Sequence, residues 1–338
     1  MEIKRAFLAG LRRTGRTRGM LAGLFFISFV VALPLGVAMS DILESAIGAS
    51  MVHENLRTGF DMDWYGEFQF GRSDLGTTFS PGIIGAGALL NNVEGLLDGG
   101  MFDGKRAVVG LGILYGLLWT FFAGGIIAVY TDAETCSRER FFGASARFFF
   151  RFVQLLVIAG ILYFLIYRYV GKPLFAGIPK WTRDWTVERP ILFLNMMAYA
   201  VVFFLLALVN MVFDYAKIHT VLYDRRNMVA ALVRGLMFVL RHPLRTLGLY
   251  YLAGVVTLII MIAYGLIAPG PSQSSMSGVV LAFLIGQVYL LARIWTKLLF
   301  WASQSAMMAA CGIRQGGEGT PGTEQSSLVD RIEGSSTA

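Results

Sequence analysis

The stretch TLGLYYLAGVVTLIIMIAYGLIAPGPSQSSMSGVVLAFLIGQVYLLA, residues 246–292, decides the fold because none of its side chains is charged. Its middle is interrupted by Pro269, Gly270 and Pro271, and four serine or glutamine residues follow. This pattern predicts two apolar helices joined by a short turn. At about 1.5 Å rise per residue, each half can cross a hydrocarbon core about 30 Å thick. The chain is therefore predicted to cross a membrane more than once.

The composition extends this prediction to the whole chain. Of the 338 residues 56% are hydrophobic and only 15% are charged, whereas a soluble domain carries about a quarter charged residues. The net charge of +7 follows from membrane orientation, so no nucleic-acid partner is predicted. The two cysteines are too few for a disulfide framework.

Further uncharged runs predict an all-α, polytopic membrane helical bundle with six transmembrane helices, occupying residues 19–314. The third run is the shortest, and Arg151 and Arg168 can extend it by snorkelling. A cleaved secretory signal peptide is the alternative for residues 1–40, but the first run exceeds the usual length of about 7 to 15 residues, which favours an anchor. The predicted spans are about 19–40, 107–131, 148–170, 190–213, 246–268 and 279–301.

Short basic loops set the predicted orientation. Placing both termini in the cytoplasm of a bacterial inner membrane puts most arginines inside, as the positive-inside rule requires. Residues 41–106 then form a small extracytoplasmic helical insertion, with helices expected at 41–56 and 81–97. This insertion is expected to cover the outer helix ends and is a possible protein-partner site. Residues 315–338 are polar and small, which predicts a disordered cytoplasmic tail.

A weak internal repeat divides the bundle into three. An amphipathic segment and a cluster of arginines precede each pair of spans, at residues 6–12, 141–147 and 228–234. The pattern predicts three helical hairpins, each introduced by an interfacial amphipathic elbow helix; the first lies in the cytoplasmic basic segment 1–18. Membrane lipids with anionic headgroups are the expected partners of Lys4, Arg5, Arg12, Arg13, Arg147, Arg151, Arg234 and Arg241.

Two passages carry a resemblance to known proteins. They are Phe213-Asp214-Tyr215-Ala216-Lys217 and Phe238-Val239-Leu240-Arg241-His242-Pro243, set among arginine-rich inner loops. With the elbow-and-hairpin pattern, they resemble an uncharacterised family of bacterial six-span integral membrane proteins. The chain is also loosely similar to the membrane domain joined to glycerophosphodiester phosphodiesterases. The similarity covers the spans and leaves out residues 41–106, and no phosphodiesterase domain is present.

The sixth span carries a polar stripe, because Tyr289, Arg293, Lys297 and Gln304 share one face of a helix. Charges inside a membrane usually pair with acids or line a wet cavity. The alternative is that Arg293 and Lys297 snorkel to the inner surface, with Trp295 and Trp301 as interfacial belt residues. The predicted intramembrane polar network comprises Arg293, Lys297, Tyr289, Gln304, Asp214, Asp132, Asn195 and Asn210, in which the asparagines form hydrogen bonds between helices.

Outside the membrane, Asp61, Asp63 and Glu67 form the densest carboxylate cluster and are weak catalytic candidates. They could hold a divalent cation or supply a general base, but such residues are more often solvated turn residues. The three histidines are scattered, so no metal site is predicted. Because the common hydrolase, nucleotide and redox motifs are absent, no cofactor is predicted either.

Three functions remain open at this stage. The first is a non-enzymatic factor for envelope or lipid organisation, or a scaffold, whose basic elbows bind anionic lipid. The second is a small-molecule transporter or permease, which requires a wet cavity at mid-membrane around Arg293, Lys297, Asp214 and Asp132. The third is a membrane-embedded transferase acting on a lipid-linked substrate, which requires Asp61, Asp63 or Glu67 to converge on one outer groove.

Overall fold

The computed structural model describes residues 2–48, 61–71, 75–79, 87, 89, 95, 106–131, 137–185, 187–268 and 275–316. All regular secondary structure in these residues is helical. Six helices are long and apolar enough to cross a membrane, so the prediction of a multi-pass, all-α membrane protein is confirmed at this level. They are α2 (Arg18–Gly48), α5 (Arg106–Thr131), α6 (Arg138–Ile166), α8 (Glu188–Tyr223), α10 (Pro243–Ile267) and α11 (Met276–Gly316).

The shorter helices accompany these six. α6 continues through a π-helical turn, η4 (Tyr167–Gly171), into α7 (Lys172–Trp181). Residues from the predicted insertion form α3 (Met62–Gly71) and the 3-10 turn η3 (Gly76–Thr78). The first and third amphipathic segments form the separate helices α1 (Glu2–Arg16) and α9 (Met228–Arg241).

The second amphipathic segment differs from this pattern, because residues 141–147 belong to the continuous helix α6. α1 is separated from α2 at Thr17. Pro243 begins α10 after α9, where its missing backbone N–H removes one bond back to the preceding helix and its fixed φ suits a first turn. No proline interrupts residues 138–166. The amphipathic segment and the third span therefore form one helix.

Several predicted boundaries change. The predicted helix 41–56 begins as the C-terminal end of α2, and its residues beyond Gly48 lie outside the described part. The predicted helix 81–97 lies mostly outside it as well, as do residues 317–338 of the predicted tail. α8 and α11 extend beyond the predicted spans, to Tyr223 and Gly316.

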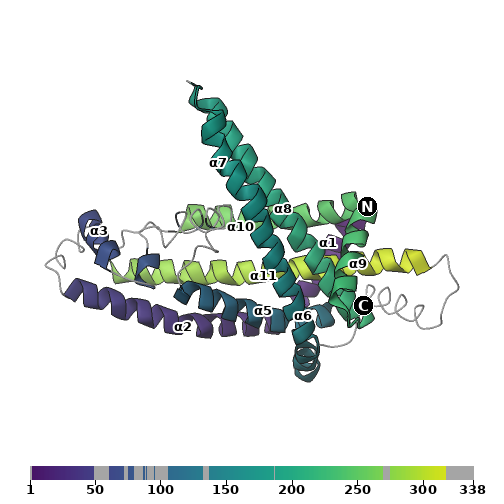
Figure 1. Cartoon of the computed structure of the whole chain (residues 1–338). Helices are drawn as coiled ribbons and strands as arrows, with labels where there is room; N and C mark the ends of the chain where they lie inside the picture. The colour runs from purple at the N-terminus through teal and green to yellow at the C-terminus, as the bar shows by residue number, and fades with distance from the viewer. Residues whose placement is uncertain are drawn as a thin grey trace.

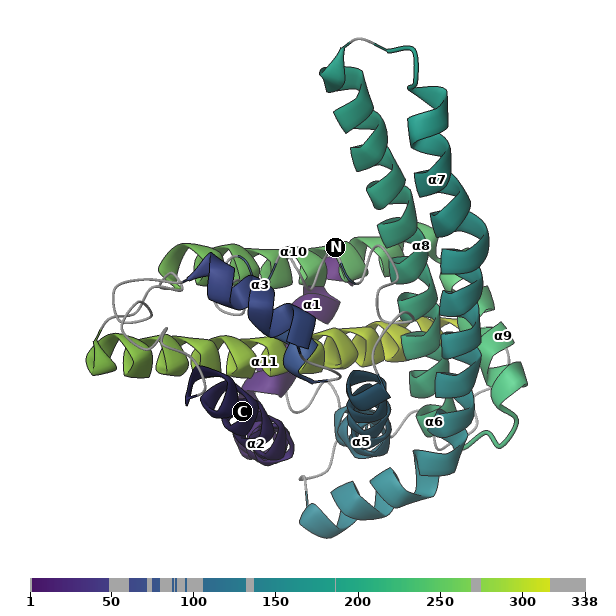
Figure 2. The ribbon, with the colours of Figure 1, turned by 60° about the vertical axis from the view of Figure 1, so that its left-hand side comes forward.

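The long helices run in two directions. α2, α5, α10 and α11 run side by side, whereas α6 with α7 and α8 form a pair that crosses them and projects beyond them (Figures 1 and 2). α5, α8 and α11 pack pairwise against one another where the two sets cross. The main buried core lies there, with Ile126, Tyr215 and Leu298 fully buried.

One kind of close contact recurs three times around this core. The first part of α6 packs on α5, α9 packs on α8, and α1 packs on α11. A glycine permits each approach, since a Cβ atom added at Gly125, Gly235 or Gly10 would meet neighbouring backbone at 3.0 Å or less. Each amphipathic segment thus packs on the span before it, and the first segment closes the ring on the last span.

Candidate functional site

A cavity of about 710 Å³ lies among α5, α6, α8, α10 and α11. Its lining residues include the middle of α5, from Tyr115 to Ala123, and the middle of α10, from Tyr250 to Thr257. Every lining residue lies on one of the six long helices. The cavity is therefore inside the bundle, and its polar lining includes Asn210, Asp214, Lys217, Tyr250, Arg293 and Lys297.

Asp214 is the carboxylate of the cavity. Its Oδ1 atom accepts a hydrogen bond of 2.9 Å from the Trp301 indole Nε1 and lies 3.5 Å from Lys217 Nζ. Asp214 is 4% exposed and Trp301 is 3% exposed. The alternative placing Trp301 in an interfacial belt is therefore wrong, because its indole is buried and bonded to α8.

Lys297 lies against two indole rings. Its Nζ atom is 3.7 Å from the centroid of the Trp119 ring and 5.5 Å from that of Trp301. The two rings meet edge to face with centroids 6.3 Å apart. A cation over an indole gains about 0.5 to 2 kcal/mol, so these rings partly replace the water that an ammonium group loses inside the bundle.

Arg293 lies one helical turn before Lys297 and lines the same cavity. Both residues are exposed, and no carboxylate of the described residues lies within 4 Å of either one. Together with Lys217, the cavity holds three cationic side chains and one carboxylate. The site therefore has an excess of positive charge.

A hydrogen bond joins two helices beside these charges. Asn210 Nδ2 on α8 donates to the Tyr250 hydroxyl on α10 at 3.0 Å, so the predicted interhelical role of Asn210 is confirmed. The Tyr250 ring also meets Phe300 of α11 with centroids 5.0 Å apart. Three of the lining helices are thereby held together at the cavity.

The cavity is built from equivalent positions of three helices. Gly125, Ala216 and Ser303 are the positions on α5, α8 and α11 at the glycine contacts described above. Six residues before each of them stand Trp119, Asn210 and Lys297, and two residues before each stand Ala123, Asp214 and Trp301. All six of these residues line the cavity. The threefold pattern of the fold therefore continues into the site.

Other residues of the predicted polar network lie elsewhere. Tyr289 stacks on Tyr264 with ring centroids 4.2 Å apart, and Gln304 is buried outside the cavity lining. Asn195 donates to the Ile191 carbonyl of its own helix at 3.0 Å, so its predicted interhelical bond is corrected. Asp132 lies outside the described residues.

Sequence reasoning missed Trp119 and Tyr250. Tryptophan in membrane helices is enriched at the interfaces, whereas Trp119 stands at the middle of α5. This position in the middle of the span is the sequence feature from which Trp119 could have been identified. Tyr250 gave none, because its position becomes informative only when α10 is placed beside Asn210.

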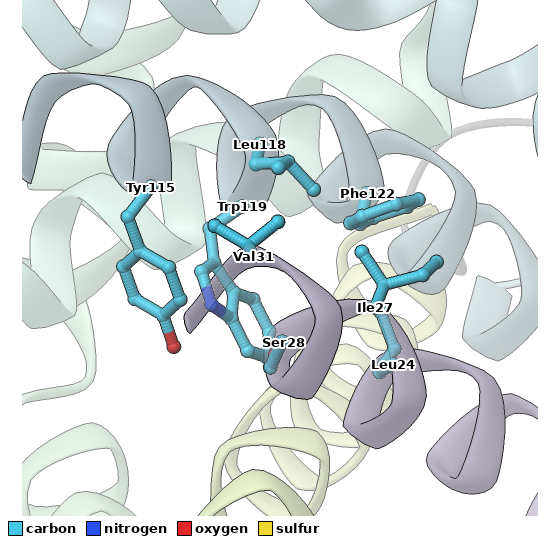
Figure 3. Close-up of a pocket in the computed structure, with 8 residues that line it drawn as sticks. All are labelled: Leu24, Ile27, Ser28, Val31, Tyr115, Leu118, Trp119 and Phe122. Atoms are coloured by element: carbon cyan, nitrogen blue, oxygen red, sulfur yellow. The ribbon is translucent and has the colours of Figure 1, made fainter. Parts of the chain in front are cut away.

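A much smaller space of about 10 Å³ lies on the other side of Trp119, between α2 and α5 (Figure 3). Leu24, Ile27 and Val31 of α2 face Trp119 and Phe122 of α5 there. This volume holds at most about one water molecule. The contact is therefore packing between helices, and Trp119 forms the wall between α2 and the large cavity.

The three carboxylates predicted as weak catalytic candidates do not converge. Asp61 Oδ1 accepts from the backbone N–H groups of Asp63 at 2.9 Å and Trp64 at 3.1 Å, and it caps the start of α3. Asp63 and Glu67 are exposed. Within the described ranges no group of acidic, histidine or cysteine side chains could hold a metal ion. The convergence that a transferase requires is thus missing from this part of the chain.

The predicted lipid-binding cations divide into two groups. Arg13 donates to the Tyr130 carbonyl at 2.8 Å, near the C-terminus of α5, and burial lowers the pKa of Arg13. Arg147 and Arg151 both bind Asp224, the latter at 2.7 Å. These three cations contact protein, although Arg147 is also exposed. The other five are exposed and have no ion pair with a described carboxylate: Lys4, Arg5, Arg12, Arg234 and Arg241.

Comparison with known proteins gives no match to a family model, a curated protein or a solved structure.

Proposed function

We propose that the protein is a carrier or permease of the bacterial inner membrane that binds a small anionic solute in the cavity of α5, α8, α10 and α11. One observation carries this proposal: the cavity holds Lys217, Arg293 and Lys297 but only one carboxylate, Asp214. Its volume of about 710 Å³ also falls within the range of about 300 to 1,000 Å³ that is usual for ligand sites.

Membrane energetics support this function over a purely structural role. An ionised side chain inside a bilayer is costly and usually marks a substrate path or an ion relay. Arg293 and Lys297 have no described carboxylate within 4 Å, so they gain more from an incoming anion than directly paired cations would. An anionic solute would therefore bind where the bundle otherwise carries an uncompensated charge.

The exposed cations of α1 and α9 support a second, compatible role in organising anionic lipid. Lys4, Arg5 and Arg12 on α1, with Arg234 and Arg241 on α9, leave their charged ends free of described partners. In this proposal α1, α9 and the first part of α6 are interfacial elbows at the inner leaflet, each before one hairpin. Both termini are then cytoplasmic, and residues 41–106 face outward for a protein partner.

Tryptophan fluorescence tests the carrier proposal, because Trp119 and Trp301 line the cavity. The full chain in phosphatidylcholine nanodiscs is titrated with inorganic phosphate or succinate at constant ionic strength. A saturable change is expected, and Lys297→Met or Arg293→Gln is expected to weaken binding about 10- to 100-fold, as losing one charged hydrogen bond predicts. Uptake of the same labelled anion into proteoliposomes then tests movement.

The matched control is Arg234→Gln, which removes an exposed arginine of α9 away from the cavity. This variant is expected to bind and take up the anion like the natural chain. Equal titrations for the natural chain and for Lys297→Met, with both proteins folded, would contradict the proposal.

A further inference from the structure

The cavity reaches the surface of the bundle on helices that are long and apolar enough to span a membrane. All its lining residues lie on spanning helices, and those from α5 and α10 lie near the middle of these helices. Tyr115 and Leu156 line the cavity and are also 41% and 38% exposed. The space outside these two side chains is therefore occupied by acyl chains when the protein is in a bilayer.

The course of α6 and α8 explains this opening. Both helices cross the set formed by α2, α5, α10 and α11 and then project away from it (Figure 2). Accordingly α8 lines the cavity only between Asn210 and Lys217, and α6 contributes only Leu156. The outer parts of α6 and α8 add no lining residue to the cavity.

The charges inside match a phosphate group. Arg293 and Lys297 are one turn apart on the same face of α11, so one group with several oxygens can accept from both. A guanidinium binds phosphate through two parallel N–H groups, and an ammonium adds a point charge. Three cations and one carboxylate leave two positive charges, and a phosphate monoester carries about −1.5 to −2 at neutral pH.

We infer that the ligand of this cavity is an amphiphilic phosphate, whose headgroup binds Arg293 and Lys297 while its apolar chain passes Tyr115 and Leu156 into the bilayer. This inference rests on the proposed function and names its substrate class. Trp119 is a positioning residue, because its ring holds the Lys297 ammonium at 3.7 Å. An apolar chain stays in hydrocarbon throughout, so only the headgroup must be transferred into the cavity.

The test compares three probes with the full chain in phosphatidylcholine nanodiscs, followed by tryptophan fluorescence and native mass spectrometry. The probes are dioctanoyl phosphatidic acid, inorganic phosphate and dioctanoyl phosphatidylcholine. Phosphatidic acid is expected to bind at a total concentration at least about tenfold lower than inorganic phosphate, because its chains partition from water into the bilayer at about 0.8 kcal/mol per methylene and concentrate the headgroup beside the cavity. Phosphatidylcholine, whose headgroup has no net charge, is expected to bind at least about tenfold more weakly than phosphatidic acid.

Variants test the contacts of the headgroup and of the apolar chain separately. Lys297→Met is expected to weaken the binding of phosphatidic acid and of inorganic phosphate about tenfold or more, and Lys297→Arg is expected to retain most of the natural affinity. Leu156→Gln is expected to weaken binding of phosphatidic acid more than binding of inorganic phosphate, because it alters the apolar wall that the chain passes. Elution as a single species in size-exclusion chromatography verifies that each variant is folded. The control is Lys180→Gln on α7, which removes an exposed cation outside the cavity and outside the proposed lipid-binding residues.

The outcomes distinguish this inference from the proposed function. If inorganic phosphate binds as tightly as phosphatidic acid, the inference of an amphiphilic ligand is overturned, while the proposed anion site remains. If phosphatidylcholine binds as tightly as phosphatidic acid, the headgroup assignment is overturned. If neither phosphate probe nor succinate binds, both the inference and the proposed function fail.

Discussion

Asp214 and Asp224 lie ten residues apart at the same end of α8, and each has two partners with N–H donors. Asp214 contacts Trp301 and Lys217 at 4% exposure. Asp224 binds Arg147 and Arg151, but its side chain is 49% exposed. The pairing is alike, whereas the surroundings differ.

This difference in exposure determines whether a charged side chain mainly stabilises the fold or can also bind a ligand. Water screens the cluster at Asp224, so its charges contribute little to stability and bind few other ligands. Inside the bundle the cations near Asp214 outnumber it, and no described carboxylate neutralises Arg293 or Lys297. The same residue types therefore stabilise the turn at Asp224 and form a candidate binding site around Asp214.

The largest expected effect comes from Asp214→Asn. Asparagine can still accept from Trp301, but Lys217, Arg293 and Lys297 then share a cavity without its carboxylate. Losing one partner of a fully buried ion pair costs about 3 to 5 kcal/mol. We expect a loss near the lower end, because Asp214 is buried but its cationic neighbours are partly or largely exposed. Thermal unfolding in detergent measures this loss, and an unchanged melting temperature would show that the cavity is already well hydrated.

Gly235→Ala tests the packing beside Asp214. A Cβ atom at Gly235 would lie 2.9 Å from the Ala216 backbone N and 3.0 Å from the Val212 carbonyl oxygen, so α9 must shift from α8. Such overpacking costs about 1 to 3 kcal/mol. Gly254→Ala on α10 is the control, since no atom lies within 4 Å of its added Cβ. Equal melting temperatures for the two variants would contradict the close α8–α9 contact.

Asp224→Asn is expected to have a smaller effect that depends on pH. The hydrogen bond from Arg151 and the charge of Arg147 lower the pKa of Asp224 in the folded state. Ionised Asp224 therefore favours folding above its unfolded pKa of about 3.9, and this contribution is lost as the pH falls through the folded pKa. Melting temperatures of the natural chain and the variant should differ at pH 7 and converge in strong acid.

Asparagine also tolerates the left-handed backbone of residue 224, where φ is 43°, so this change isolates the charge. A difference that stays constant from pH 7 down to pH 2 would assign the effect to packing and not to ionisation.

The smallest effect is expected from Arg147→Gln. Its side chain is 60% exposed, whereas that of Arg151 is 18% exposed and also donates to the Arg225 carbonyl. Surface ion pairs contribute little because water competes for both charges. The melting temperature should change less than for Arg151→Gln, and the reverse order would mean that Arg147 is buried in the membrane-bound protein.

Local pattern was enough to predict much of the fold. Runs without charge predicted all six long helices, since an uncharged run of this length requires hydrocarbon around it. Apolar and basic residues recur at helical spacing in residues 2–16 and 228–241, so the sequence also predicts the short helices α1 and α9. The continuous helix through residues 141–147 and the third span does not follow from the sequence, because no local residue pattern indicates whether the helix breaks there.

The candidate site was only half predictable. The stripe of Arg293 and Lys297 follows from helical spacing on one chain segment. Trp301 was assigned to an interface because tryptophan usually lies there, yet it bonds to Asp214 from a distant helix. Asn195 and Asn210 have the same chemistry and lie on the same helix, but only Asn210 meets a partner on another helix.

The sequence by itself determined that this chain has six helices long and apolar enough to span a membrane, because hydrophobicity and charge act along the chain and need no partner. Only the tertiary structure decided that α5, α8 and α11 enclose a cavity with more cations than acids. Whether a charge is paired depends on which distant helix lies beside it, and the crossing of the helices sets that distance.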